Sequence, residues 1–262
     1  MTAHTLNPRD IDFLLYEFLD TEGLLERPRY SDHSRESFDA TISGVRDIAT
    51  NFYANHYQEG DKHEPLFQNG EVKLIPPIKA AWDATVEFGL LGASYDYDEG
   101  GVQLPDVISK VAGGLIQAAN SGSSGYYFVT NAASNLIRTF GSEQQKSQFL
   151  ASMIDGRSTG TMALTEPGQG STLADITTSA HVSEGGSYLI RGQKIYISNG
   201  DHGLSENIVH LVLARIEGAP SGTRGISLFI VPKFLVNTDG TTGARNDVAL
   251  AGLLHKMGNK SA

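Results

Sequence analysis

TMALTEPGQGSTL, residues 161–173, is the stretch at which the pattern of the chain changes. An apolar run typical of a strand ends at Thr165, and a Glu-Pro step with two nearby glycines follows it. Glycine permits a bend in which successive amide N–H groups point into one concavity and hold an anion, and the hydroxyls of Thr165 and Ser171 can add hydrogen bonds. The stretch has neither the glycine pattern of a Rossmann fingerprint nor the lysine of a P-loop. Taken alone, it is also explained by an ordinary Pro-Gly turn.

Before this stretch, apolar residues recur at helical spacing and the breaks carry capping chemistry. Ser142, with Gln145 three residues later, has the pattern of a capping box. In the first helix we expect one apolar stripe, made of Ile11, Leu14, Leu15, Phe18 and Leu19. Helices are expected to begin at Asn7-Pro8, at Glu36 (running to about Glu59), at Pro76-Pro77 (to Gly89), at Pro105, before Gly125 (to Gly141) and at Ser142 (to Gly156). Residues 1–157 are therefore predicted to form an all-helical domain.

After residue 157 the period of the apolar residues changes to two, and glycine-bearing turns separate short runs of branched and aromatic residues. Strands are expected in 158–165, 179–185, 187–193, 194–200, 208–216 and 225–232. This spacing suggests a barrel or a sandwich. The predicted fold class is α+β, with a helical domain at 1–157 and a β domain at 158–262.

Composition limits the function. The 262 residues include no cysteine and carry a formal charge of −10, which excludes thiolate chemistry and disfavours nucleic acid or an anionic membrane as partner. The first ten residues lack the features of a secretory signal, and no stretch has the roughly 20 apolar residues of a membrane helix. We expect a soluble, cytoplasmic protein.

A second candidate segment is GQKIYISNGDH, residues 192–202. On a strand, Lys194, Tyr196 and Ser198 share one face while Ile195 and Ile197 point to the other. A flat heterocycle could lie on the aromatic and hydroxyl pair. The alternative is a half-buried strand that turns Tyr196 and Ser198 to water before an Asn-Gly turn.

Read together, the two segments resemble the acyl-CoA dehydrogenase family, in which a T-E-P-x-x-G-S element and a G-x-K-x-[WYF]-I-[TS]-N/G-G element bracket FAD. The resemblance extends over essentially the whole chain. It is closest to the long subgroup that includes methylmercaptopropionyl-CoA dehydrogenase.

The resemblance implies a helical domain packed on a β-barrel, with FAD bound where the barrel meets a C-terminal helical bundle that is expected to be absent from this chain. Gly170 and Ser171 are expected at the pyrophosphate, Tyr196 on the flavin and Ser198 at its N5/O4 edge. Many relatives have Trp and Thr at these last two positions, and Asp at Thr172. The residues expected to bind the cofactor are Met162, Leu164, Thr165, Gly170, Ser171, Tyr196, Ile197 and Ser198, with Ala163 beside them.

The implied reaction is the FAD-dependent dehydrogenation of an acyl-CoA thioester to the trans-2-enoyl-CoA, in fatty acid metabolism. Electron-transferring flavoprotein is the expected electron acceptor, and a homo-oligomer is expected. The family's catalytic Glu lies in the C-terminal bundle, so no catalytic residue is assigned and residues 1–262 alone are expected to be inactive. Glu166 belongs to the turn and is not a substitute. The alternatives are a non-catalytic or half-site flavin-binding subunit of a heteromer, and another flavin reaction on the same scaffold.

Other residues point to no further chemistry. The eight histidines, among them His202, His210 and His255, show no metal-binding spacing, so hydrogen-bonded or surface roles and no metal are expected. There is no G-x-S-x-G element for a hydrolase. The loop at residues 94–105 resembles the family segment that helps to wall the acyl pocket.

Overall fold

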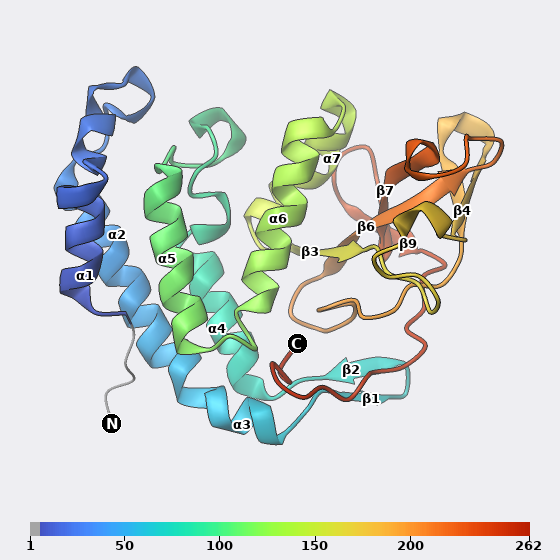
Figure 1. Cartoon of the computed structure of the whole chain (residues 1–262), viewed down its shortest axis with the longest axis horizontal. Coiled ribbons are helices and arrows are strands. Elements are labelled where there is room, and N and C mark those ends of the chain that lie inside the picture. The colour runs from blue at the N-terminus through green and yellow to red at the C-terminus, as the bar shows by residue number, and fades with distance from the viewer. Residues whose placement is uncertain (1–5) are drawn as a thin grey trace.

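The structure, a computed structural model, describes residues 6–262 and consists of a helical half followed along the chain by a curled sheet (Figure 1). Residues 1–5 lie outside the described residues. They include the start of the expected helical domain and part of the segment that is expected to lack a secretory signal. The α-helices are α1 (Pro8–Asp12), α2 (Arg35–Ile48), α3 (Tyr57–Lys62), α4 (Pro76–Glu87), α5 (Asp106–Ala119), α6 (Gly125–Phe140) and α7 (Glu143–Ile154). The strands are β1 (Leu66–Gln68), β2 (Glu71–Lys73), β3 (Ser158–Ala163), β4 (Ser179–Val182), β5 (Tyr188–Arg191), β6 (Asn207–Ile216), β7 (Ile226–Pro232), β8 (Phe234–Val236) and β9 (Thr242–Arg245).

The capping residues identified in the sequence set the helix ends. The side chain of Asn7 accepts a hydrogen bond from the amide of Arg9 at 3.1 Å, at the start of α1. Ser142 and Gln145 form the predicted capping box, because each side chain accepts a hydrogen bond from the other residue's amide. These contacts satisfy amides that have no partner inside the helix.

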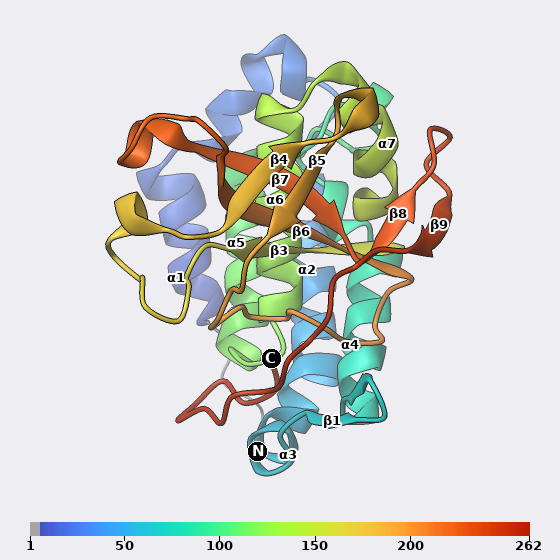
Figure 2. The same ribbon diagram turned by 90° about the vertical axis from the view of Figure 1, so that its right-hand side faces the viewer.

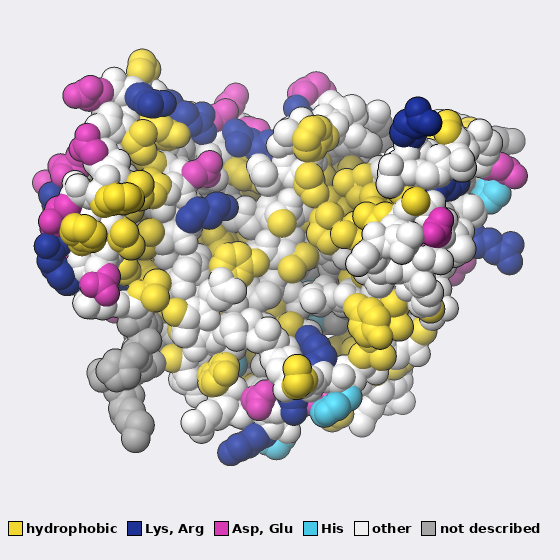
Figure 3. Space-filling model, viewed as in Figure 1, with side chains coloured by type: hydrophobic (Ala, Val, Ile, Leu, Met, Phe, Trp, Pro, Cys, Tyr) yellow, Lys and Arg dark blue, Asp and Glu magenta, His cyan; other side chains and the backbone are white. Residues whose placement is uncertain are grey.

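The expected apolar stripe of the first helix is wrong. Ile11 and Leu15 are buried, but Leu14, Phe18 and Leu19 are 50%, 70% and 53% exposed. The reason is that α1 ends at Asp12 and a π-helical turn follows, which changes the number of residues per turn and rotates later side chains away from the core. Hydrophobic side chains therefore gather on the edge of the molecule that this segment forms (Figure 3).

The sequence predicts that residues 1–157 are all helical, but this half also contains a β-hairpin. The hairpin of β1 and β2 lies between α3 and α4, and its turn is Asn69-Gly70, with φ of +54° and +81°. An Asn-Gly pair at positive φ is the preferred two-residue hairpin turn. The long helix expected from Glu36 to Glu59 is also interrupted, because α2 ends at Ile48 and π- and 3₁₀-helical turns lead into α3.

In the β half, five strands form one sheet. Four of them follow the order β3-β6-β4-β5, and the fifth, β7, pairs with β6. The strand β6 is parallel to β3 and β4 and antiparallel to β7. The strands β8 and β9 form a separate hairpin. The segment 194–200, expected to be a strand, is irregular. Figure 2 shows the sheet lying across α6.

The two halves meet where β3 packs on α6. A Cβ added to Gly160 of β3 would lie 2.6 Å from the Cβ of Ala133, so only glycine allows this approach. The amide of Gly160 donates to the hydroxyl of Thr130 at 3.0 Å. Met153 of α7 and Leu211 of β6 complete a buried cluster at this junction. The predicted fold, a helical N-terminal domain followed by a curled β domain, is confirmed.

No helix within residues 6–262 follows β9. None of the helices in the described part of the chain combines the length and the apolar character that crossing a membrane requires.

Candidate functional site

The bend after β3 is a tight turn between Glu166 and Gln169. The amide of each residue donates to the carbonyl oxygen of the other, at 2.9 and 3.0 Å. Neither Gly168 nor Gly170 has a positive φ, so the alternation of right- and left-handed residues that makes an anion nest is not present here. The ordinary Pro-Gly turn is therefore the correct interpretation of the backbone. Space around both glycines is open, since an added Cβ would meet no atom within 4 Å.

A buried carboxylate organises this turn. Glu166 is 4% exposed, and its carboxylate accepts hydrogen bonds from the amides and hydroxyls of Thr177 and Thr178 and from the ammonium group of Lys194, at 2.5–2.9 Å. Burial by itself would raise the pKa of Glu166, but the bonds from Lys194, Thr178 and Thr177 outweigh it and hold the pKa well below its usual range. The Glu166 side chain is therefore an anion at every physiological pH.

The second segment differs from the expected strand. Its residues do not alternate, because Tyr196 and Asn199 both have left-handed backbones, with φ of +60° and +57°. Lys194 turns inward to Glu166, whereas Tyr196 is 74% exposed and Ser198 is exposed. The expectation that Lys194, Tyr196 and Ser198 share one face is therefore wrong. An ion pair and a backbone change separate the lysine from the tyrosine.

The two segments nevertheless lie side by side. The amide of Ile195 donates to the carbonyl oxygen of Thr165 at 2.9 Å, and the ammonium group of Lys194 donates to the carbonyl oxygen of Leu164 at 3.1 Å. Of the residues predicted for the cofactor, Met162, Leu164, Thr165 and Ile197 are half-buried, and Gly170, Ser171, Tyr196 and Ser198 are exposed.

An open cleft of about 2060 Å³ lies beside the sheet. Tyr196, Ile197 and Ser198 line it, together with Ala163 and the segment 246–256. The other predicted residues, Met162, Leu164, Thr165, Gly170 and Ser171, are not part of its lining. The structure thus joins the two motifs through their backbones but does not gather all their side chains into one cavity.

The sequence matches two protein-family models, described as the N-terminal domain of acyl-CoA dehydrogenase over residues 36–157 and its middle domain over residues 161–260. The chain belongs to the acyl-CoA dehydrogenase family.

The 3-methylmercaptopropionyl-CoA dehydrogenase of Ruegeria pomeroyi is 40% identical over 203 residues, 78% of this chain and 34% of that protein. A butyryl-CoA dehydrogenase of Syntrophomonas wolfei is 36% identical, over 95% of this chain and 42% of that protein. The crystal structure of an acyl-CoA dehydrogenase complexed with FAD from Bacillus anthracis has a TM-score of 0.68 at 26% identity, over 88% of this chain and 35% of that one. The chain spans less than half the length of these relatives.

In the β half of this family member two histidines are buried, His202 at the end of the second segment and His210 in β6. The ring of His202 bonds the hydroxyl of Thr159 at 3.2 Å, and Nδ1 of His210 lies 2.7 Å from the hydroxyl of Thr161. Burial, with a smaller contribution from Lys233, lowers the pKa of His202 to about 3. Burial likewise lowers the pKa of His210 to about 4. Both rings are therefore neutral at pH 7, and of the two roles expected for the histidines, surface or hydrogen-bonded, these two have the hydrogen-bonded one.

Two polar features of the site were missed in the sequence. The ammonium group of Lys233 pairs with Asp201 at the edge of the cleft. The Asn199 side chain is buried, and neither its amide nitrogen nor its carbonyl oxygen has a partner among residues 6–262. The Asn-Gly pair is predicted as a turn and as the end of the family element, and neither reading indicates that the asparagine side chain is buried.

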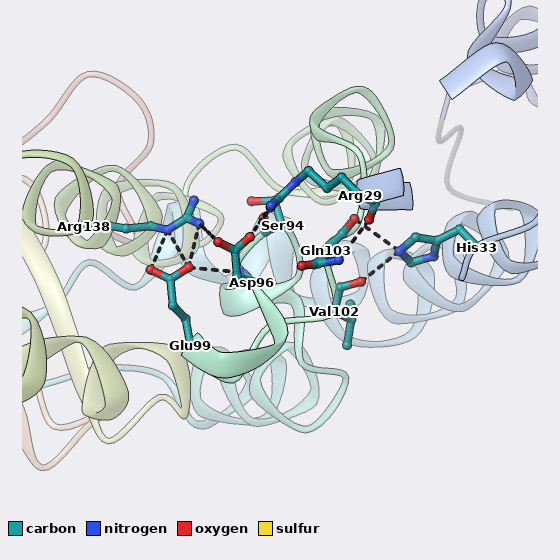
Figure 4. A network of polar contacts seen from close by, with 8 residues as sticks. All are labelled: Arg29, His33, Ser94, Asp96, Glu99, Val102, Gln103 and Arg138. Atoms are coloured by element: carbon teal, nitrogen blue, oxygen red, sulfur yellow. Dashed lines mark hydrogen bonds and ion pairs between the residues drawn. The ribbon is translucent and has the colours of Figure 1, made fainter. Parts of the chain in front are cut away.

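The loop at residues 94–105 is held by a network of charges (Figure 4). Asp96 pairs with Arg29 from the N-terminal segment and with Arg138 of α6. Arg138 also binds Glu99 at 2.6 Å, and its hydrogen bond lowers the pKa of Glu99. Nε2 of His33 donates to the carbonyl oxygen of Val102 at 2.8 Å. The loop is thus fixed on both sides.

Proposed function

We propose that this chain is the flavin-binding part of an FAD-dependent acyl-CoA dehydrogenase. The observation that carries the proposal is the joining of the two motifs, through the bond from Ile195 to Thr165 and the ion pair of Lys194 with Glu166. Family membership and the FAD complex of the Bacillus anthracis relative support the same cofactor.

The residues present fit a dinucleotide. The turn at Gly168 and Gly170 has open space at both α-carbons, so a bulky group can approach its backbone. The Asn199 amide, buried without a partner in the described part of the chain, has unused hydrogen-bonding capacity beside Ser198. Such groups are rare in folded proteins, and a bound molecule that supplies both a donor and an acceptor would satisfy this one.

Each part of the site then has a role. Met162, Leu164 and Thr165 would lie along the flavin ring system, and Gly170 and Ser171 would hold the pyrophosphate. Tyr196 and Ile197 would cover the ring, and the hydroxyl of Ser198 would donate at its polar edge. Bound FAD supplies the hydride acceptor. The protein holds and orients the reactants and excludes water from them.

The substrate of the proposed activity is an acyl-CoA thioester, whose α-proton a carboxylate base must remove. Glu166 does not meet this need, because five donors occupy its carboxylate and its pKa is lowered. We place the base outside residues 6–262. Electron-transferring flavoprotein as the acceptor, a homo-oligomeric assembly and a cytoplasmic location belong to the same proposal and rest on the family resemblance.

The test is a visible spectrum of the natural full-length protein loaded with FAD and titrated with a panel of acyl-CoAs. Loss of the flavin band on substrate addition is expected, because hydride arrival reduces the flavin. Failure to bind FAD, or an unchanged band with every acyl-CoA, would overturn the proposal. A second polypeptide in equal amount, detected by intact mass spectrometry, would instead favour the half-site subunit.

A further inference from the structure

One carboxylate connects three segments that are distant in sequence. Glu166 follows β3, and its two oxygens bind Thr177 and Thr178, which precede β4, as well as Lys194. The ammonium group of Lys194 also donates to the carbonyl oxygen of Leu164. The side chains of Glu166 and Lys194 are 3% and 10% exposed. Solvent therefore screens this pair very little.

Such a pair is poorly explained by stability alone. Removing two charges from water costs free energy that their attraction only partly offsets, and well-packed apolar residues often stabilise a fold as much. What a buried ion pair with five hydrogen bonds does provide is a single geometry, since each bond has a narrow range of distance and angle.

The exposed tyrosine has no anchor of its own. Tyr196 is 74% exposed and makes no hydrogen bond within the described residues, so its own side chain does not hold it in place. Its backbone is left-handed, which is unfavourable for a bulky residue and persists only where neighbours impose it. The nearest anchors are Lys194 on Glu166 and the amide of Ile195 on Thr165.

We propose that Glu166 and Lys194 are positioning residues that fix Tyr196 and Ser198 against the turn at 165–171, and so set the affinity for the flavin. The inference rests on the proposed function. It assigns no contact between either charge and the cofactor. The pair acts by holding two backbone segments in register before the ligand arrives.

The experiment uses the natural full-length protein with Lys194→Met. This variant leaves Glu166 with four donors from Thr177 and Thr178, so the fold is expected to persist. Lys194→Arg is the conservative variant, and Lys79→Met, which removes an exposed ion pair with Asp83, is the matched control. Circular dichroism verifies that each variant is folded.

Two measurements follow, the first without cofactor. Hydrogen exchange of the peptide 192–199 reports the bond from Ile195 to Thr165, and Lys194→Met should speed it by about tenfold or more. The second is the FAD dissociation constant, which should rise by about tenfold, or about 1.4 kcal/mol, with partial recovery in Lys194→Arg. The control should change neither.

The outcomes separate the two proposals. Wild-type protein that fails to bind FAD overturns the proposed function, while hydrogen exchange still tests the coupling between the segments. Wild-type protein that binds FAD, with Lys194→Met binding equally well and exchanging equally slowly, overturns the positioning role. If Lys194→Met does not fold, Lys194→Gln, which keeps a hydrogen-bond donor but removes the charge, replaces it, and an affinity and an exchange rate equal to those of wild type in that variant overturn the role.

Discussion

The molecule contains two polar clusters that perform similar tasks in different surroundings. One is the buried cluster of Glu166 with Lys194, which joins the turn after β3 to residues 194–195. The other is the network of Arg29, Asp96 and Arg138, which fixes the loop at 94–105. Side chains of the first are at most 10% exposed, whereas those of the second are 25–39% exposed.

The difference in exposure predicts a difference in consequence. A half-exposed ion pair contributes little to stability and weakens with salt, because water and ions screen its charges. A buried pair is screened far less, and losing one partner leaves the other buried without a counter-charge. The turn after β3 should therefore be held rigidly by Glu166 and Lys194, whereas the loop at 94–105 should be more mobile.

The largest effect is expected from Glu166→Ala. The substitution leaves Lys194 buried without a counter-charge and leaves the donors of the buried Thr178 without their acceptor, so the free energy of unfolding should fall by about 3–5 kcal/mol. Urea denaturation followed by circular dichroism measures this. Glu143→Ala, which removes a carboxylate that is 91% exposed, is the control and should change stability by less than about 0.5 kcal/mol. Similar losses of unfolding free energy in Glu166→Ala and Glu143→Ala would contradict the expected difference between a buried and an exposed carboxylate.

Lowering the pH should destabilise the β half through its two buried histidines before it protonates Glu166. The folded pKa values of His202 and His210, about 3 and about 4, lie below the unfolded value of about 6.5, so the unfolded state binds more protons as pH falls. Stability is thus complete above pH 6.5 and declines below it, by about 2–4 kcal/mol at pH 5. The linkage of Glu166 has the same sign, because its folded pKa is also lowered, but its contribution to stability is lost only as the pH falls below its unfolded pKa of about 4.5, so Glu166 stays ionised through this range.

Thermal unfolding measured between pH 7 and pH 5 tests this. The double variant His202→Gln/His210→Gln keeps hydrogen-bonding groups but cannot be protonated, and should lose most of the pH dependence even if it is less stable at pH 7. A double variant with the full wild-type slope would assign the acid sensitivity to other groups.

The junction between the helical half and the β half differs from both charged clusters, because close packing of β3 on α6 holds it together. Gly160→Ala would place a methyl group 2.6 Å from the Cβ of Ala133, so α6 and β3 must separate. The expected loss is about 1–3 kcal/mol, typical of an overpacked core. The control is Gly203→Ala, where an added Cβ meets nothing within 4 Å. Denaturation of Gly160→Ala/Ala133→Gly should show only partial recovery, because the added methyl group still meets Cε of Met153 at 2.9 Å and Cα of Thr130 at 3.2 Å. A Gly160→Ala variant as stable as Gly203→Ala would contradict a steric cause.

Sequence patterns predicted the parts of this structure that local chemistry controls. The caps at Asn7 and Ser142 and the strand β6 are set by residues close in sequence, and the structure has them as expected. The family motifs also identified the turn after β3. Local patterns carried no information about the inward rotation of Lys194, because its partner, Glu166, lies 28 residues away in the chain.

The errors share a physical cause. The period of two in residues 194–200 was interpreted as a strand, but a tertiary ion pair and the left-handed Tyr196 override that pattern. In the first helix, a π-helical turn that no propensity indicates exposes Leu14 and Phe18. Backbone irregularities at such positions depend on contacts formed only in the folded chain.

The smallest effect is expected from Asp96→Asn in the loop network. The substitution keeps the shape of the side chain and removes the charge that pairs with Arg29 and Arg138. At about 0.05 M salt the free energy of unfolding should fall by about 0.5–1 kcal/mol, the range for exposed ion pairs. Urea denaturation at this salt concentration measures it.

Repeating the Asp96→Asn measurement at about 1 M salt gives the decisive contrast, because the Debye length there is only about 3 Å. The difference from wild type should largely disappear, since screening already weakens the same interaction in the wild type. Lys194→Met, measured alongside, should lose as much stability at high salt as at low salt. A loop variant whose loss is independent of salt would mean that the network is effectively buried, and that it holds the loop at 94–105 as rigidly as Glu166 and Lys194 hold the turn after β3.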